Sequence, residues 1–363
     1  MPLTDGGRSP KHNKVFFSSG RRRACFFVLF LCVAAFSKRI YQDSIQAHEK
    51  SKGDVVAKPD DLITLPLNPK SENIQGVDHY YMLPQVKAKG VLIFLHSCKQ
   101  SGLEFFHLPE DRIVAYDALN KGLAVFAPTS KDRESGCFTE IDVGWIDKVV
   151  DEWAANHELA FSPRIGMSVS SGSSLMFYAY KALKLKSMAV YNTPQSFHKE
   201  SLEKGLAIPT AYITMPLDEI ISSQMKKNFD RLSSAKVSTR LFEVHPHPFT
   251  PSLCLTRFPE IVPKDCEEIF RFAHKNFPRL FNGDDFLNVK ESMASSRWQK
   301  LLTKVELNYE LNETYYQKSQ AASGHSWLWA IIEEEARSSQ GFHAMTAEHH
   351  SSILNFLIQH SLI

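Results

Sequence analysis

The sequence lacks the short motifs that mark common metal and nucleotide sites. Its 363 residues include no pair of cysteines separated by two residues, no HExxH, and no GxxxxGK followed by Ser or Thr. These absences argue against a zinc centre and a P-loop, so we expect no metal and no cofactor. No repeat of a solenoid period is present. The net charge is only +2, so no nucleic-acid-binding surface is predicted.

Apolar residues are abundant by comparison. They make up 43% of the chain, which is enough to fill a sizeable core. The length fits one large domain with tails or two small domains. Shifts in composition predict a basic N-terminal tail (1–23), an apolar segment (24–36), a polar linker (37–75) and a main domain (76–363).

The apolar segment 24–36 follows three consecutive arginines, Arg21, Arg22 and Arg23. A basic stretch followed by a short apolar run is typical of a signal peptide. The run is shorter than the roughly 20 residues that a membrane span needs. A cleaved signal peptide is therefore the first prediction. An uncleaved short membrane anchor and a buried strand are the alternatives. Secretory or endomembrane routing is expected, and the VAAF step also resembles bipartite plastid targeting.

Four cysteines lie beyond the apolar segment: Cys98, Cys137, Cys254 and Cys266. Four cysteines allow three disulfide connectivities, and the sequence does not choose among them. In a lumenal domain, Cys254 with Cys266 is the most local pair, and buried free thiols are the alternative. Asn312 begins a glycosylation sequon that only the secretory route would use.

Strands and helices alternate along the main domain. Continuous apolar runs such as GVLIFL (90–95) and LAVFA (123–127) are typical of strands that are buried on both faces of a sheet. Helical spacing of apolar residues appears in the segments that separate such runs, for example over 143–159. This alternation over roughly 170 residues predicts an α/β fold with a doubly wound, mostly parallel sheet and helices on both faces.

Polar residues follow several of these strands directly. In an open parallel sheet, the site forms at the carboxyl ends of the strands. The first such end is HSCKQSG (96–102), the second is SVSSG (168–172), and the third is LDE (217–219). Ser170 lies between a strand and a helix, with Ser168 and Gly172 as small neighbours. This setting predicts a nucleophilic serine, whereas the simpler interpretation is a helix N-cap.

The order of these three features resembles the α/β-hydrolase superfamily, over about residues 76–244. The resemblance implies an α/β-hydrolase fold and a serine hydrolase that works through an acyl-enzyme. Ser170 would be the nucleophile and Asp218 the acid, with Glu219 as the alternative acid. The N–H groups of Ser171 and of Cys98 or Ser97 would form the oxyanion hole.

The sequence departs from this family at two positions. Ser168 and Ser97 stand where the family usually has glycine, one in the elbow and one in the oxyanion turn. These departures keep an alternative open, in which a catalytically impaired hydrolase fold serves as a binding or scaffold protein.

The general base has four candidates. In the family, the histidine loop leads into the last helix, and this order favours His343. His245 and His247 directly follow a strand, about 27 residues after Asp218, and His325 opens an apolar helical pattern. With His343 as the base, residues 248–335 form a helical insertion that we interpret as a cap over the site.

These features predict a serine hydrolase that cleaves a carboxylic ester, with a peptide-like carbonyl as the second choice. The substrate is expected to be a small molecule or peptide with an apolar part, because the insertion is rich in phenylalanine. Any membrane association is expected through the N-terminal segment.

Overall fold

The computed structural model describes residues 67–248, 250–252 and 345–361, and a few positions between 267 and 287. Segment 24–36, Cys254, Cys266, Asn312 and most of the predicted insertion lie outside these ranges. In the part of the chain that is described, no helix is long and apolar enough to cross a membrane.

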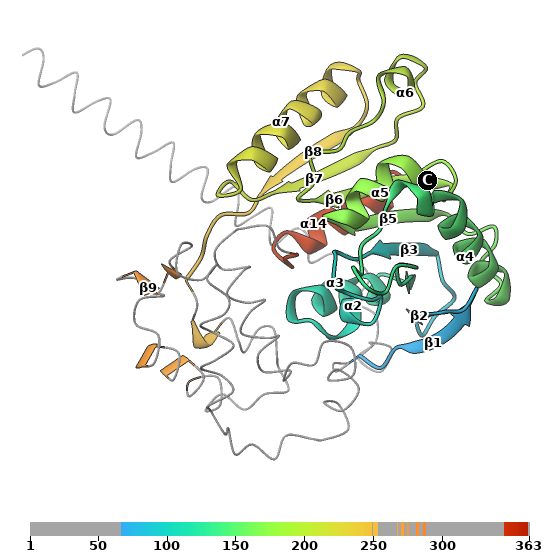
Figure 1. Cartoon of the computed structure of the whole chain (residues 1–363), viewed down its shortest axis with the longest axis horizontal. Coiled ribbons are helices and arrows are strands. Elements are labelled where there is room, and N and C mark those ends of the chain that lie inside the picture. Colours follow the sequence, from blue (N-terminus) through green and yellow to red (C-terminus); the bar gives the residue numbers. More distant parts are fainter. Residues whose placement is uncertain are drawn as a thin grey trace, which may run out of the picture. The chain divides into compact units, whose positions relative to one another are not determined.

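An eight-stranded sheet forms the centre of the fold, with the strand order β1-β2-β4-β3-β5-β6-β7-β8 (Figure 1). The first two strands run antiparallel to their neighbours, and the pairs from β4 onward are parallel. The strands are β1 (Lys70–Ile74), β2 (Val77–Met82), β3 (Gly90–Leu95), β4 (Leu123–Ala127), β5 (Arg164–Val169), β6 (Leu185–Tyr191), β7 (Thr210–Thr214) and β8 (Thr239–Glu243).

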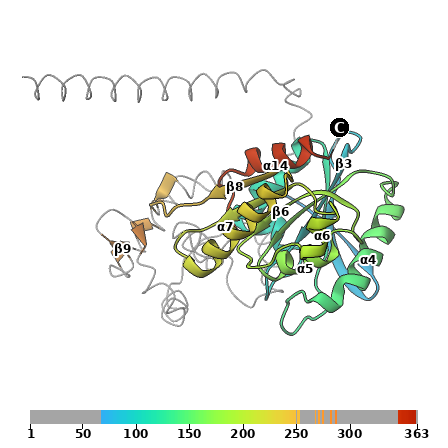
Figure 2. The same ribbon diagram turned by 90° about the horizontal axis from the view of Figure 1, so that it is seen from above.

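Helices cover both faces of this sheet, as the doubly wound pattern predicted (Figure 2). The main helices are α2 (Glu104–His107), α3 (Pro109–Asn120), α4 (Val143–Asn156), α5 (Ser171–Ala179), α6 (Lys199–Glu203), α7 (Glu219–Ser234) and α14 (His350–Gln359). A short 3-10 helix, η3 (Glu140–Asp142), precedes α4. The two-residue strands β9 (Phe281–Asn282) and β10 (Phe286–Leu287) pair with each other.

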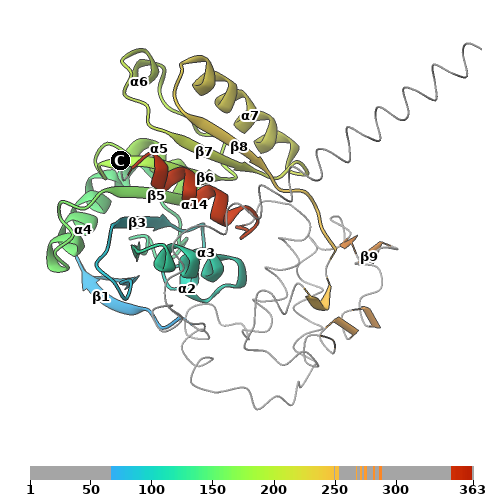
Figure 3. The same cartoon turned by 180° about the vertical axis from the view of Figure 1, so that it is seen from behind.

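The buried apolar side chains form two clusters, one on each face of the sheet. One cluster joins the sheet to α2, α3 and α14, and the other joins it to α4, α5 and α7. Viewed from behind, α14 lies beside α3 and across β6 (Figure 3). The central strands β3, β4 and β5 are buried at every position, because helices cover both of their faces.

The sheet begins earlier in the sequence than predicted. Strand β1 and the buried Leu67 both belong to the stretch that composition assigned to a polar linker over 37–75. The predicted boundary at residue 76 is therefore wrong, and the domain extends back at least to Leu67. Composition did not reveal β1 because it is an edge strand with the sequence KSENI, in which only Ile74 is buried.

Candidate active site

Ser170 occupies a sharp turn between β5 and α5. Its backbone has φ 51° and ψ −110°, a conformation that residues with a side chain rarely adopt. The N–H of Ser170 donates to the carbonyl oxygen of Tyr191 on β6 at 3.0 Å, which helps to hold the turn. Such a strained strand-to-helix turn lifts a serine hydroxyl out of the end of the sheet. This backbone conformation is the geometry of a nucleophile elbow.

The neighbours of Ser170 explain why the turn needs small residues. A Cβ atom on Gly172 would lie 2.3 Å from the carbonyl oxygen of Leu95, so α5 approaches the end of β3 too closely for a side chain. Ser168 is fully buried, and its hydroxyl donates to the carbonyl oxygen of Ala189 at 3.4 Å. The departure from glycine at position 168 is therefore accommodated between β5 and β6, beneath the elbow.

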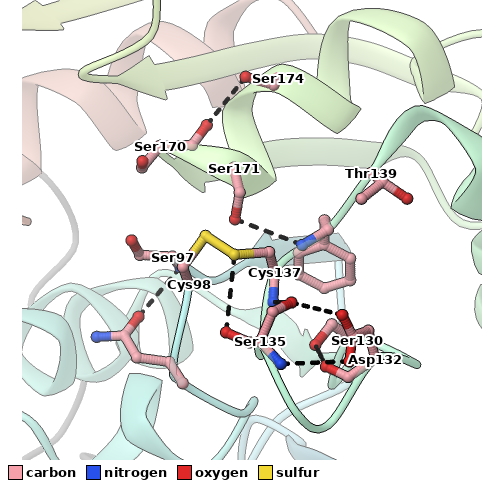
Figure 4. Close-up of a disulfide and its surroundings, with 12 residues drawn as sticks. Ser97, Cys98, Ser130, Asp132, Ser135, Cys137, Thr139, Ser170, Ser171 and Ser174 are labelled. Carbon is pink, nitrogen blue, oxygen red and sulfur yellow. Dashed lines mark hydrogen bonds between the residues drawn. A yellow bond between two sulfur atoms is a disulfide. The ribbon is translucent and has the colours of Figure 1, made fainter.

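The turn after β3 presents the predicted oxyanion donors (Figure 4). The N–H of Ser97 donates to Oε1 of Gln100 at 3.0 Å, so this group is already used within the turn. Within residues 67–252, the N–H groups of Cys98 and Ser171 donate to no acceptor. Ser171 begins α5, where the first N–H groups have no partner inside the helix. The N–H of Ser97 is thus occupied within the turn, whereas the role of the Cys98 N–H as the second oxyanion donor stays a prediction.

Cys98 forms a disulfide with Cys137, which lies 39 residues further along the chain. The two Cα atoms are 4.1 Å apart. Figure 4 shows this disulfide on the side of Ser171 that faces the turn after β3. The sequence left the pairing of the cysteines open. In the structure, Cys98 pairs with Cys137, so neither of these two is a free thiol.

Two buried histidines fix the strand ends beneath this turn. Nε2 of His96 accepts from the N–H of Ser130 at 3.1 Å, so its Nδ1 carries the proton and donates to the carbonyl oxygen of Ser97 at 2.6 Å. His79 accepts from the N–H of Thr129 through Nδ1 at 3.0 Å. Burial lowers the pKa of His96 to about 3 and that of His79 to about 4. Both rings are therefore neutral at pH 7.

These two histidines predict that the domain loses stability in mild acid. In the unfolded chain each ring takes up a proton near pH 6.5, whereas the folded state excludes it down to about pH 4. Above about pH 6.5 both rings are neutral in the folded and the unfolded chain, so the histidines do not lower the free energy of unfolding there. It should fall by about 1 kcal/mol per pH unit for each histidine as the pH drops from 6.5 towards 4.

Urea unfolding at pH 7.5, 6.0 and 5.0 would measure this slope. A double variant, His79→Asn with His96→Asn, should be less stable at pH 7.5 and should show a much flatter slope. Replacement of the exposed His198 by asparagine serves as the control and should leave the slope unchanged. An equally steep slope in the double variant would contradict the assignment.

Asp218 follows β7 through Met215 and directly precedes α7. Its N–H donates to the carbonyl oxygen of Met215 at 2.9 Å, and its own carbonyl oxygen accepts from Ser222 at 2.8 Å. Its carboxylate makes no capping hydrogen bond to α7, so the simple role of a helix N-cap does not explain this residue. Glu219, the alternative acid, is exposed.

The strand order places Ser170 and Asp218 at the same edge of the sheet. Ser170 follows β5 and Asp218 follows β7, with β6 between these two strands. Neighbouring strands are about 4.8 Å apart, so the two strand ends are separated by roughly 10 Å. An imidazole that makes one hydrogen bond of about 2.8 Å to each side chain fits such a gap.

The structure describes two of the four candidate bases. His245 has 68% of its side chain exposed, with its Nε2 3.9 Å from Oε2 of Glu243 on β8, the last strand in the order of the described sheet. His247 lies beside Pro248, whose carbonyl oxygen is 3.4 Å from its Nδ1. His325 and His343 lie outside the described residues, so the choice of the base stays a prediction.

The segment that leads into α14 is held by a buried carboxylate. Glu110 is fully buried near the start of α3, and its Oε2 accepts from the hydroxyl of Thr346 at 3.2 Å and from the N–H of Ala347. Met345 is buried in the same cluster as Val244, the residue after β8. The segment that begins two residues after His343 is thus held beside the start of α3.

Sequence reasoning missed Glu110, Cys137 and Gln100 as parts of this site. Glu110 carried no signal, because a glutamate in the first turn of a helix usually faces solvent. Cys137 was named without a partner. Gln100 lies within the turn 96–102, but nothing in the sequence shows that its side chain accepts from Ser97. Among the described residues, no group of three His, Cys, Asp or Glu side chains is arranged to hold a metal ion.

No protein-family model matches this sequence, and no match was found among curated proteins. Similar solved structures include a dienelactone hydrolase from Anabaena variabilis (16% identity, covering 52% of this chain and 94% of that one, TM-score 0.37). The Bacillus cereus carboxylesterase is 14% identical, covering 49% of this chain and 91% of its own, with a TM-score of 0.36. A carboxylesterase from Mesorhizobium loti is also 14% identical, covering 52% and 96%, with a TM-score of 0.36.

The sheet and its helices define a doubly wound α/β protein with a serine in a strained turn after the fifth strand. The strand order, the antiparallel second strand and the elbow after β5 are those of the α/β-hydrolase fold, and the chain has this fold. The assignment rests on the topology and the elbow of this chain itself.

Proposed function

We propose that this protein is a serine hydrolase that cleaves carboxylic esters through an acyl-enzyme. The observation that carries the proposal is the backbone of Ser170, which holds φ 51° between β5 and α5. Strain of this kind costs of order 1–3 kcal/mol and persists where the surrounding structure enforces it, commonly at functional sites. A helix N-cap needs no such conformation, because cap residues usually have extended backbone.

In the proposed reaction, the hydroxyl of Ser170 attacks the ester carbonyl carbon while His343 takes its proton. Asp218 holds the imidazole in the required tautomer. The N–H groups of Ser171 and Cys98 stabilise the negative charge that develops on the carbonyl oxygen. His343 then returns the proton to the leaving alcohol, and water releases the acyl group by the same route.

Labelling with a fluorophosphonate probe tests the nucleophile. The wild-type chain should be labelled, because the probe reacts with an activated serine, and Ser170→Ala should lose the label. Ser174→Ala, from the same serine-rich stretch, is the matched control and should be labelled like the wild type. Ser168 is no alternative, because it is fully buried.

Two outcomes would contradict the proposal. Persistent labelling of Ser170→Ala would assign the reaction to another residue. A wild-type chain that neither takes the label nor hydrolyses a small ester such as a nitrophenyl butyrate would favour the binding or scaffold protein. The choice between ester and peptide-like substrates follows from comparing turnover of the ester with that of the matching anilide.

A further inference from the structure

The disulfide Cys98–Cys137 connects the turn after β3 to a second loop that contacts the elbow. This loop, residues 130–138, follows β4 and leads into η3. At its far end, the N–H of Phe138 donates to the hydroxyl of Ser171 at 3.4 Å. The loop is therefore bonded covalently to one residue of the proposed oxyanion hole and by a hydrogen bond to the other.

Loop 130–138 is ordered by its own hydrogen bonds. The carboxylate of Asp132 accepts from the hydroxyl of Ser135 at 2.6 Å and from its N–H at 3.2 Å. The hydroxyl of Ser135 also accepts from the N–H of Cys137 at 3.1 Å. Phe138 is buried, with its ring centroid 4.6 Å from that of His96. The loop therefore offers Cys98 a fixed point of attachment.

The turn that carries Cys98 meets this loop through close backbone contacts as well as through the disulfide. Lys99 is exposed and has φ 61°, a left-handed conformation that a lysine rarely adopts. Its N–H donates to the carbonyl oxygen of Ser135 at 3.0 Å. Gly136 has φ +60°, and a Cβ atom there would be 2.8 Å from the backbone of Lys99. The disulfide, together with this close approach, keeps the turn in its strained conformation.

We propose that the Cys98–Cys137 disulfide positions the Cys98 N–H in the oxyanion hole, so that reducing it switches hydrolysis down. The inference rests on the proposed function. Both cysteines are half-buried rather than enclosed in the core. Without the covalent link, the strain at Lys99 favours relaxation of the turn, which moves the N–H of Cys98 away from the developing charge. The nucleophile itself is held by β5, β6 and α5 and stays in place.

Reduction by a dithiol such as dithiothreitol is chemically balanced. One thiolate of the reagent attacks a sulfur of the disulfide and forms a mixed disulfide, and the second thiol then displaces the protein sulfur. The reagent gives up two electrons and leaves as a cyclic disulfide. Its two protons end on the thiols of Cys98 and Cys137.

The test compares ester hydrolysis by the oxidised full chain with hydrolysis by the chain treated with dithiothreitol. Loss of one oxyanion donor lowers kcat by about 10²–10³-fold, so a displaced donor should lower it by about 10–100-fold. KM should change by less than about twofold, because the ground-state ester does not depend on this contact. Reoxidation should restore kcat, and far-UV circular dichroism of the reduced chain should match that of the oxidised chain.

Two variants separate this effect from other consequences of reduction. Cys137→Ser should have the kcat of the reduced wild type and should no longer respond to dithiothreitol. Ser135→Ala keeps the disulfide but removes hydrogen bonds of the loop, so it should still respond.

The outcomes separate the disulfide proposal from the proposed function. Unchanged kcat in the reduced wild type, or a Cys137→Ser variant that dithiothreitol still inactivates, would overturn the positioning role while leaving the hydrolase intact. Unfolding on reduction would also overturn it, because the disulfide would then be structural only. Failure of the oxidised chain to hydrolyse any ester would overturn both proposals.

Discussion

Replacing His343 by alanine is expected to lower kcat for a small ester by about 10⁴–10⁶-fold, with the domain still folded. The loss is large because the members of a triad act as a unit, and a serine hydroxyl without its base is a weak nucleophile. Chain order and the described segment 345–347 both support this choice. Glu110 holds Thr346 and Ala347 beside the start of α3, and Met345 is buried in the core cluster that covers the same face of the sheet.

Stopped-flow or steady-state assays of ester hydrolysis would measure the loss, and circular dichroism would check that the variant is folded. His245→Ala and His247→Ala are the matched controls, and both should keep their rates. His245 is largely exposed at the edge strand, which is a poor setting for a base that must reach Ser170. If either control loses its rate while His343→Ala keeps it, residues 248–335 follow a completed triad and are not an insertion before the base.

Gly172→Ala is expected to destabilise the domain strongly. The added Cβ would meet the carbonyl oxygen of Leu95 at 2.3 Å and its carbonyl carbon at 2.6 Å. Both atoms belong to the backbone of the fully buried strand β3, so neither moves without disturbing the centre of the sheet. Overpacking of this kind costs about 1–3 kcal/mol, and the upper end applies here. Activity should also fall, because α5 carries the N–H of Ser171.

Thermal unfolding would show the effect as a fall in Tm of roughly 5–10 °C. Gly144→Ala is the matched control, since it adds the same methyl group near the start of α4, where no heavy atom lies within 4 Å. That change should leave the domain equally stable or stabilise it by up to about 1 kcal/mol. A Gly172→Ala variant as stable as Gly144→Ala would show that α5 can move away from β3.

The sequence predicted the parts of the fold in which burial and pattern agree. Strands β3 and β4 are buried on both faces, and their continuous apolar runs identified them. Strand β1 was missed, because an edge strand such as KSENI needs only one buried side chain. The doubly wound arrangement, with helices on both faces, followed from the alternation of the two patterns and is confirmed.

The site was predictable to the extent that its residues follow strands directly. Ser170 was singled out because small neighbours surround it, and the structure shows a strained backbone at this position; its role as nucleophile stays a prediction. The pairing of Cys98 with Cys137 was not predictable, because the two cysteines come together only when the turns after β3 and β4 meet. The burial of Glu110 depends on residues 346 and 347, more than 200 positions away, and no local pattern carries such information.

The packing of α14 also has a consequence for how the protein is made. Ile353, Leu354 and Leu357 of this helix are completely buried in the cluster that covers one face of the sheet. Before residues 350–359 have been synthesised, the nascent chain already contains strands β1 to β8, but part of that face of the sheet is uncovered. Such exposed apolar surface favours aggregation in partly folded chains. The domain can therefore complete its core only after this helix has been translated.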